Sequence, residues 1–471
     1  MPLLGAFIVP HPPLIVPEVG RGQEQKINDT IHAFEKVARR IAELKPDTII
    51  ITSPHSVLYS DYIHISSGTQ AKGDFGSFGL PSVNYTVKYD SEFVEELSNL
   101  AKQYNIPAGT LGEGMMTQNG RSVSTKELDH GTMVPISFIN KVYTDYKLVR
   151  ISISGLSNLT HYQFGECIGE LTENSEKKYV FVASGDLSHK LKEDGPYGYA
   201  KEGELFDKEI IKAMSEGDFM RFLTFEESFL DKAAECGLRS FVIMAGALNG
   251  KSIHSELLSY EGPFGVGYGV AAFEINGKDE NRKFGQIFEE HQNKELAHIK
   301  EKEDDYVKLA RQSLEFYVKH QQILKRPVDL LPELLTKQAG VFVSLKKDGK
   351  LRGCIGTILA TTNCIADEII QNAISAGLQD HRFEPVEEEE LPWLVYDVDV
   401  LGKSEPIKSI TELDVKRYGV IVTYKDRRGL LLPNLEGVNT PEQQVSIALN
   451  KANISEKEAY SMERFEVVRH L

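Results

Sequence analysis

The chain has 471 residues, of which 41% are hydrophobic and 26% are charged, so its length predicts two or more domains with cores of their own. No apolar run reaches the roughly 20 residues of a membrane-spanning helix, and a formal net charge of −16 argues against a nucleic-acid partner, whose phosphates need a basic face. Four cysteines and an N-terminus without a signal-peptide pattern predict a cytoplasmic protein that has no structural disulfides.

Up to about residue 275 the sequence alternates short apolar runs with longer segments of helical period, which is typical of an α/β domain. The runs are rich in Ile and Val and end at Ser, Pro or Gly, as strands do. The expected strands cover 5–10, 47–56, 62–67, 148–154 and 178–189. The expected helices cover 27–45, 91–104 and the strongly apolar 238–248. Residues 1–275 are therefore predicted to form a sheet with flanking helices.

The composition changes after this domain. From Gly277 to about Asp305 the chain is dense in charge and poor in β-branched residues, which indicates a charged linker over 276–300 that leads into a helix. Residues 301–471 predict a second, smaller α+β domain. Its expected helices cover 304–321 and 364–380, and its expected strands cover 339–347, 393–401 and 418–424. The acidic run 387–390 is interpreted as a solvated surface.

Histidines follow several of the N-terminal strands. His11 and His55 each come after an apolar run and a proline, in "FIVPH" and "ITSPH". His130 in "ELDHGTMVP" and His189 in "ASGDLSHK" follow the same pattern. The carboxyl ends of strands form the ligand crevice of an open α/β sheet, so these imidazoles are expected to converge. Glu235 precedes an apolar helix, where a carboxylate is costly unless it pairs or binds a cation. The economical interpretation is a metal site.

The residue types limit which metal ion such a site would bind. Two imidazoles and one carboxylate that leave other positions open form the facial triad of non-haem Fe(II) oxygenases, whereas closed zinc sites prefer four Cys or His ligands. Further histidines near such a centre can move protons at neutral pH. Taken singly, each histidine is more often a surface, strand or core residue, and Glu235 alone could be an acid that interacts with a helix N-terminus.

Five motifs in order carry a family resemblance. "VPHPP", "TSPHS", "DHGTMVP", "SGDLSHK" and "AAECGLRSFVIMAGAL" resemble the class III extradiol ring-cleavage dioxygenases, the LigB-like catalytic subunits, over roughly residues 1–275. The resemblance implies an oxidoreductase that cleaves a catechol-like aromatic with dioxygen. It implies Fe(II) held by His11, His55 and Glu235, with His189 as the acid/base and His130 as a histidine that positions substrate or oxygen.

The resemblance leaves alternatives for the reaction and the metal. The related Memo family shares this fold without established ring cleavage, so the fold does not settle the chemistry. Some zinc relatives ligate the metal through the histidine that matches His189, so zinc and a ligand role for His189 are alternatives. Relatives of this fold often pair, which makes a homodimer one expectation for an oligomeric state that the sequence leaves open.

The second domain contains "LRGCIGT", in which two glycines flank Cys354 and imply a tight backbone path. A catalytic thiol would need a depressed pKa, for which Arg352 is the neighbouring cation and His381 is the candidate partner. In that case the domain would hold a hydrolase nucleophile, which is the third-ranked hypothesis. We favour the other interpretation, an inert, buried cysteine in a glycine-rich turn, because most free cysteines are inert core residues.

"LRGCIGT", "DHRFEPV", "YDVDVL" and "RGLLLPNLEGVNTPEQQVSIALNKANI" resemble the AMMECR family over about residues 300–471. Such proteins occur beside Memo-like and radical S-adenosylmethionine proteins in the AmmeMemoRadiSam system, and a LigB-like domain fused to an AMMECR domain is similar to protein A of that system. The first hypothesis is therefore an Fe(II)-dependent, extradiol dioxygenase-like oxidoreductase. The second is a metal-binding, non-oxygenase component of an AmmeMemoRadiSam-type modification system, with a radical S-adenosylmethionine or Memo-like protein as partner.

Overall fold

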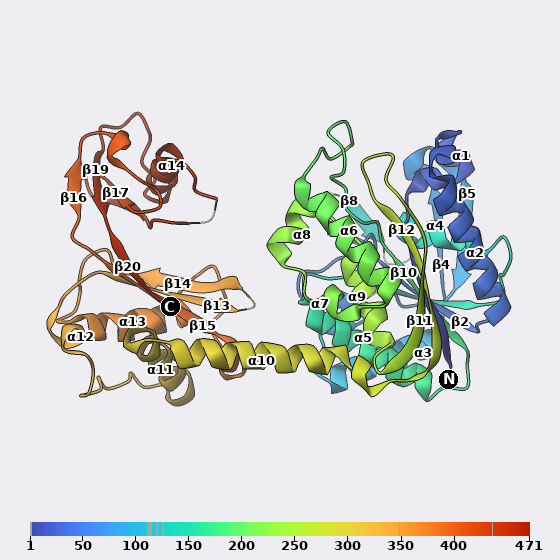
Figure 1. Ribbon diagram of the computed structural model, residues 1–471, viewed down its shortest axis with the longest axis horizontal. Helices are drawn as coiled ribbons and strands as arrows, with labels where there is room; N and C mark the ends of the chain where they lie inside the picture. The colour runs from blue at the N-terminus through green and yellow to red at the C-terminus, as the bar shows by residue number, and fades with distance from the viewer. Residues whose placement is uncertain (1, 111–114, 119–120, 125–126, 348, 436) are drawn as a thin grey trace. The chain divides into compact units, whose positions relative to one another are not determined.

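The computed structural model describes residues 2–110, 115–118, 121–124, 127–347, 349–435 and 437–471 (Figure 1). The chain divides into two compact units, Met1–Glu290 and His291–Leu471. The division falls within helix α10 (Phe284–Lys302), which forms from the charged segment between the two domains. In the described part of the chain, no helix combines the length and apolar character needed to cross a membrane.

A mixed six-stranded sheet forms the centre of the N-terminal unit, in the order β11-β12-β1-β10-β2-β9. Its strands are β1 (Leu3–Val9), β2 (Thr48–Ser53), β9 (Lys147–Ser152), β10 (Tyr179–Ser184), β11 (Lys251–Glu261) and β12 (Tyr268–Lys278). The strands β1, β10, β2 and β9 are parallel, whereas β12 runs antiparallel to both β1 and β11. Since β10 lies between β1 and β2, segments far apart in the sequence leave the sheet side by side.

Helices cover both faces of this sheet, and alternate residues of β1 point into two separate cores. Ala6 and Ile8 belong to the core shared with α3, α5, α6, α7, α8 and α9, whereas Phe7 and Val9 belong to the core shared with α2 and α4. The helices and 3₁₀ turns that the structure describes ahead of α10 are α1 (Pro17–Gly20), α2 (Asn28–Leu44), α3 (Ser91–Gln103), α4 (His130–Ile139), α5 (Asn158–Glu173), α6 (Lys201–Glu216), α7 (Phe219–Leu223), α8 (Glu227–Ala233), α9 (Leu238–Ala247), η1 (Pro13–Ile15), η2 (Gln23–Ile27), η3 (Gly76–Phe78) and η4 (Glu280–Arg282). The helix predicted for 27–45 is present as α2, and its apolar residues lie on one buried face.

Short strand pairs lie outside the central sheet. They are β3 (Ile63–His64) with β6 (Ala108–Gly109), β4 (Gln70–Phe75) with β5 (Leu80–Lys88), and β7 (Met115–Gln118) with β8 (Arg121–Ser124). The strand expected at 62–67 is thus reduced to two residues. The β4–β5 hairpin lacks a strong sequence signal because most of β5 is exposed.

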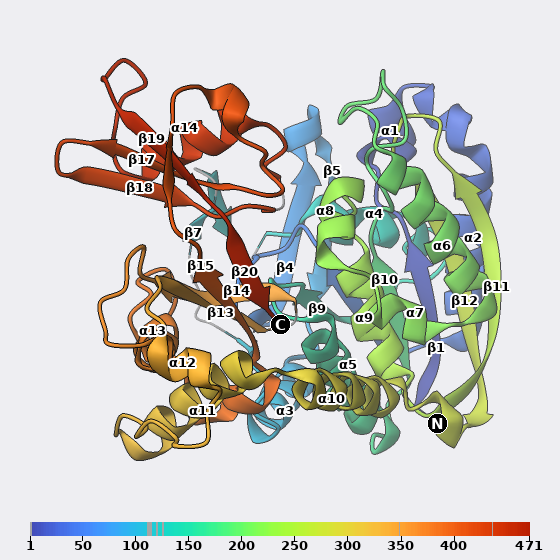
Figure 2. The same cartoon turned by 60° about the vertical axis from the view of Figure 1, so that its left-hand side comes forward.

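The C-terminal unit contains two antiparallel sheets, in the orders β14-β13-β15-β20 and β16-β19-β17-β18. Helices α11 and α13 pack on the first sheet, and α14 packs on the second (Figure 2). The elements are α11 (Asp305–His320), α12 (Pro332–Thr336), α13 (Ile365–Leu378), α14 (Pro441–Lys451), β13 (Val341–Lys347), β14 (Lys350–Gly356), β15 (Val395–Leu401), β16 (Glu405–Ile407), β17 (Gly419–Tyr424), β18 (Arg427–Leu431), β19 (Ser461–Phe465), β20 (Val467–His470), η5 (Glu388–Trp393) and η6 (Ile410–Glu412). The predicted classes, α/β followed by a smaller α+β domain, are confirmed.

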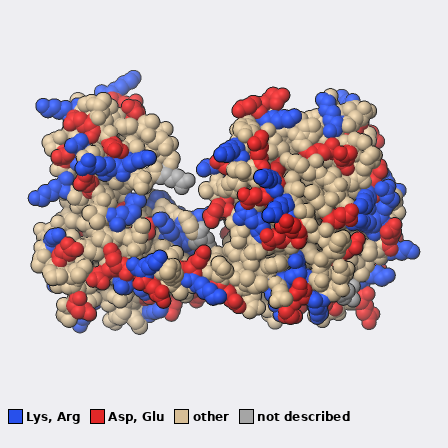
Figure 3. Space-filling view, in the orientation of Figure 1, with Lys and Arg blue, Asp and Glu red and all other residues tan. Residues whose placement is uncertain are grey.

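Acidic and basic side chains are interspersed on the face of each unit drawn in Figure 3. Some charged side chains are paired: Lys36 and Arg40 of α2 both contact Glu256 of β11. Exposed pairs of this kind contribute little to stability.

Candidate metal centre

His11 and His55 meet at the carboxyl ends of β1 and β2. The His11 side chain is buried, and its Nε2 lies 2.9 Å from Nε2 of His55. The backbone of His11 is fixed because its N–H donates to Asp186 Oδ1 at 2.7 Å. The expected convergence of these two imidazoles is therefore present in the structure.

Hydrogen bonding determines which nitrogen of His11 is basic. The Ser184 hydroxyl donates its single proton to the carbonyl of Gly131 at 2.6 Å, so it must accept from His11 Nδ1, 3.0 Å away. Nδ1 of His11 therefore carries the proton, and the lone pair is on Nε2, which faces His55. A hydrogen bond at one ring nitrogen that frees the other is the usual arrangement of a metal-ligating histidine.

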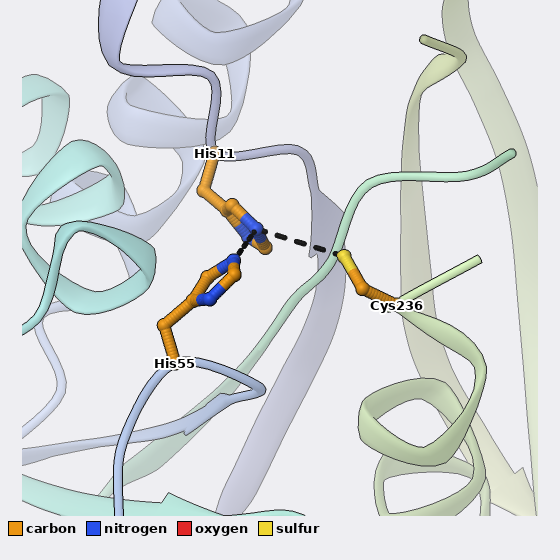
Figure 4. A group of neighbouring side chains, drawn as sticks. All are labelled: His11, His55 and Cys236. Carbon is orange, nitrogen blue, oxygen red and sulfur yellow. Dashed lines mark hydrogen bonds between the residues drawn. The ribbon is translucent and has the colours of Figure 1, made fainter. Parts of the chain in front are cut away.

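Cys236 lies beside the two histidines, just ahead of α9. Its Sγ is 3.7 Å from His11 Nε2, and the ligand atoms of His11, His55 and Cys236 all lie within 4.8 Å of one another (Figure 4). Nitrogens about 2.1 Å from one metal ion in neighbouring positions are about 3.0–3.4 Å apart, and a nitrogen and a thiolate sulfur are about 3.6 Å apart. The two measured distances are close to these values, so the donor set fits one metal ion.

Glu235 lies next to this set, but its carboxylate has another partner. Its Oε2 accepts from the N–H of Leu238 at 2.6 Å, in the first turn of α9. Burial raises the pKa of Glu235, and the bond from Leu238 lowers it in part. The role of Glu235 as a ligand thus stays a prediction. Sequence reasoning missed Cys236, although "AAECG" places it directly after Glu235.

Two further histidines complete what we call the histidine cluster, which consists of His11, His55, His130 and His189. The ring of His130, the first residue of α4, lies 4.1 Å from the ring of His55 and 5.5 Å from that of His11, between centroids. Nδ1 of His189 donates to the carbonyl of Ala234, so the lone pair of His189 is on Nε2.

Burial controls the charge of His11 and His55. It lowers the pKa of His11 well below the usual value, and the neighbouring His55, His130 and His189 lower it further. Burial and His130 lower the pKa of His55 to about 4. His11 and His55 are therefore neutral at pH 7, which is the form that binds a metal ion.

Asp129 organises the side of the cluster formed by His55 and His130. It is the N-cap of α4, where its carboxylate accepts from the N–H and the hydroxyl of Thr132, each at 3.0 Å. It also accepts from the Ser53 hydroxyl at 2.5 Å, and that hydroxyl oxygen accepts from the N–H of His55 at 3.2 Å. One carboxylate thus positions the segments that carry both histidines.

Arg150 of β9 supports Asp129 from within the protein. It is fully buried, and its guanidinium lies 3.5 Å from Asp129 Oδ2. It also donates to the Ser66 hydroxyl at 2.8 Å and to the carbonyl of Glu127 at 2.5 Å. Burial raises the pKa of Asp129, but the charge of Arg150 and the bond from Ser53 bring it below the usual value.

In the C-terminal unit, Arg352 does not serve the thiol of Cys354. Its Nε and one terminal nitrogen donate to the two carboxylate oxygens of Glu390 at 2.9 and 2.7 Å, and Lys347 lies 3.2 Å from the same carboxylate. The interpretation of the acidic run as a solvated surface is therefore wrong for Glu390. The sequence could not reveal this pairing, because Glu390 lies in η5, far along the chain from Lys347 of β13 and Arg352 of β14.

Cys354 is held by its backbone and has a protonated thiol. Its N–H donates to Asp380 at 2.9 Å, and its carbonyl accepts from Arg382 at 3.3 Å. Burial raises the pKa of the thiol, while the Ser344 hydroxyl, which donates to Sγ at 3.3 Å, lowers it in part. His381 is exposed. These observations favour the inert cysteine over a nucleophile.

Comparison with known proteins gives a family match for each unit. Residues 5–271 match the family of the catalytic LigB subunit of aromatic ring-opening dioxygenase, and residues 307–470 match the AMMECR1 family. A protein of Clostridium acetobutylicum is 44% identical over 471 residues, which cover 100% of this chain and 99% of that protein. A protein of Thermotoga maritima is 48% identical over 170 residues, which cover 36% of this chain and 98% of that protein.

Two solved structures are also similar. An uncharacterised protein from Pyrococcus horikoshii has 30% identity and a TM-score of 0.33, and the match covers 35% of this chain and 88% of that one. An uncharacterised protein from Escherichia coli has 13% identity and a TM-score of 0.36, and the match covers 57% of this chain and 99% of that one. From the two family matches, this chain belongs to the family of the catalytic LigB subunit of aromatic ring-opening dioxygenases and carries an AMMECR1 domain after it.

Proposed function

We propose that the N-terminal unit is a metal-dependent oxidoreductase of the extradiol type, which opens the ring of a catechol-like aromatic with dioxygen at a non-haem Fe(II) site. The observation that carries this proposal is the pair of facing Nε2 atoms of His11 and His55, 2.9 Å apart at the carboxyl ends of β1 and β2. Strand ends of this kind are where open α/β sheets bind ligands.

The third ligand decides how well iron fits. A carboxylate from Glu235 would complete the two-histidine, one-carboxylate set of Fe(II) oxygenases, whereas a thiolate from Cys236 is a softer donor and favours zinc or copper. In the structure the sulfur of Cys236 is close to His11 and the Glu235 carboxylate caps α9. Iron with Glu235 requires that carboxylate to turn towards the two histidines, because the ligand atoms that lie within 4.8 Å of one another belong to His11, His55 and Cys236.

The remaining histidines supply proton transfer and orientation. Bound Fe(II) would supply the electron and dioxygen chemistry that no side chain can provide. His189 is held through its Nδ1 to Ala234, so its Nε2 is the nitrogen that accepts a proton from a diol hydroxyl. His130, packed against His55, would position substrate or oxygen.

The test is oxygen uptake by protein purified and reloaded with Fe(II) under anaerobic conditions, measured with a panel of catechols. His189→Gln is expected to keep its metal and to lose turnover by about 10²- to 10⁴-fold, as the loss of a general acid/base does. His254→Gln, which changes an exposed histidine of β11, is the matched control and should match wild type. Absence of oxygen uptake with every catechol would refute the proposal. Loss of metal in His189→Gln would make His189 a ligand.

A second candidate is a metal-binding, non-oxygenase component of an AmmeMemoRadiSam-type modification system, with a radical S-adenosylmethionine or Memo-like protein as partner. Two observations favour it: the position of Cys236 in the cluster, and the AMMECR1 domain on the same chain. A full metal complement without oxygen uptake, together with co-elution with such a partner, would support it. A ring-opened product from any catechol would contradict it.

A further inference from the structure

Two exposed aromatic rings of the N-terminal unit lie against the histidine cluster. Phe78 is 38% exposed, and its ring centroid lies 5.5 Å from that of His130 at an interplanar angle of 75°. Tyr197 is 61% exposed, and its ring centroid lies 5.1 Å from that of His189 at 69°. Both contacts are edge-to-face, which is a favoured geometry for aromatic pairs.

The local structure holds Phe78 at this place. It ends η3, the turn between β4 and β5, where the N–H of Gly76 donates to Asp74 Oδ1 at 2.6 Å and Gly79 closes the turn at a φ of 82°. That left-handed φ favours glycine. Phe75, three residues earlier, is fully buried in the core that includes α4. The ring of Phe78 is thus anchored on the helix that begins with His130.

Backbone contacts hold the loop that carries Tyr197. Its loop is closed by a backbone bridge between Leu191 and Tyr199, and the N–H of Leu191 donates to the carbonyl of Gly265 at 3.1 Å. The loop begins at His189, whose ring is itself fixed through Nδ1. A ring that is mostly exposed therefore stands at a defined place beside an imidazole of the cluster.

The two rings belong to different sides of the proposed metal centre. Phe78 contacts His130, which packs on His55. Tyr197 contacts His189, which bonds to Ala234, two residues before Cys236. His55 and Cys236 both lie beside His11 Nε2, at 2.9 and 3.7 Å, and Figure 4 shows them approaching it from different directions.

We infer that Phe78 and Tyr197 form an aromatic rim that selects a planar aromatic ligand with two adjacent oxygens over a non-aromatic chelator of the same metal. The exposed area of each ring is apolar surface that a ligand ring would cover, and the edges and faces of aromatic rings pair favourably. The inference rests on the proposed function and goes further, because it assigns ligand selection to residues that hold neither metal nor proton.

The test compares two bidentate ligands of the zinc-loaded full chain, in which no turnover occurs. 4-Nitrocatechol, followed by its absorption change, carries an aromatic ring, and acetohydroxamate, followed by calorimetry, does not. Phe78→Leu and Tyr197→Leu are each expected to weaken the binding of 4-nitrocatechol by about 3- to 10-fold, which corresponds to the loss of one aromatic pair. Neither variant should change the affinity for acetohydroxamate. Tyr197→Phe and Phe78→Tyr keep a ring and should bind both ligands as wild type does.

Tyr104→Leu is the matched control, because Tyr104 is also exposed, at 51%, and bonds to Glu170. It should bind both ligands as wild type does. The aromatic rim is refuted if the two leucine variants bind 4-nitrocatechol as tightly as wild type does, or if their affinities for both ligands fall equally. Neither result would contradict the metal site. Wild-type protein that takes up no metal overturns the proposed function, and the rim with it.

Discussion

Replacement of Arg150 by methionine is the sharpest test of how the histidine cluster is supported. Arg150→Met keeps an unbranched side chain of similar length but removes the charge that faces Asp129. The Arg150 side chain is 1% exposed and that of Asp129 is 10% exposed, so water cannot replace the lost partner. Asp129 would then be a buried, unpaired carboxylate.

The expected loss follows from the distance and the burial. At 3.5 Å and an effective dielectric constant of about 20, two unit charges attract by roughly 5 kcal/mol. Removal of one partner from a buried pair typically costs about 3–5 kcal/mol. Because Asp129 keeps its hydrogen bonds from Ser53 and Thr132, we expect the N-terminal unit to lose about 3 kcal/mol of its free energy of unfolding.

Denaturant unfolding can assign this loss to one unit. Trp393 is the single tryptophan of the chain and lies in η5 of the C-terminal unit. Its fluorescence therefore follows that unit, whereas far-UV circular dichroism follows both. Arg150→Met should shift the unfolding transition of the N-terminal unit, which circular dichroism detects and Trp393 fluorescence does not. Asp129→Asn combined with Arg150→Met removes both charges and should recover at least about 1 kcal/mol.

A loss of less than about 1 kcal/mol in Arg150→Met would refute the reasoning, because a buried pair would then contribute no more than an exposed one. An equal shift of the Trp393 transition would also contradict it, since Arg150 belongs to the other unit.

Three further predictions concern titration. Burial raises the pKa of Asp207 to about 7, so the folded state holds a proton that the unfolded state releases. The free energy of unfolding therefore falls as pH rises from about 4 to 7, and Asp207→Asn should remove this pH dependence. Circular-dichroism melts that show the same pH dependence in Asp207→Asn would contradict the prediction. Burial raises the pKa of Glu390, but Arg352 and Lys347 outweigh burial and lower this pKa to about 2. The contribution of Glu390 to the free energy of unfolding is therefore complete above about pH 4.5 and is lost as pH falls towards 2. Glu390→Gln should lower the free energy of unfolding at pH 7 by about 1.5–3 kcal/mol, measured by Trp393 fluorescence, and an unchanged value would refute the prediction. Burial raises the pKa of Cys354, so iodoacetamide at pH 7.4 should label it more slowly than free cysteine, and faster labelling would revive the nucleophile.

The strand-end histidines could be predicted because the N-terminal strands are continuous apolar runs, so the residue at which each run ends is visible in the sequence. His11, His55 and His189 all follow such runs. Their meeting also depends on the order of the sheet, in which β10 lies between β1 and β2. The sequence does not show this strand order, but the convergence could still be expected, because ligands bind at the carboxyl ends of strands in open α/β sheets.

The rest of the site depends on contacts between distant segments. The choice between Glu235 and Cys236 is a matter of which side chain turns towards His11 and which towards α9. Phe78 could not be found, because its hairpin is mostly exposed and polar and carries little hydrophobic pattern. Arg150 is expected as a strand residue, but its burial becomes understandable only once Asp129 lies opposite it.

Metal content tests the central claim most directly. Mass spectrometry on protein purified anaerobically and reloaded with Fe(II) should find about one equivalent in wild type and in the control His254→Ala, and almost none in His11→Ala and His55→Ala. Comparison of Glu235→Ala with Cys236→Ser identifies the third ligand as the one whose loss releases the metal. No metal in wild type, or full occupancy in both histidine variants, would contradict the account.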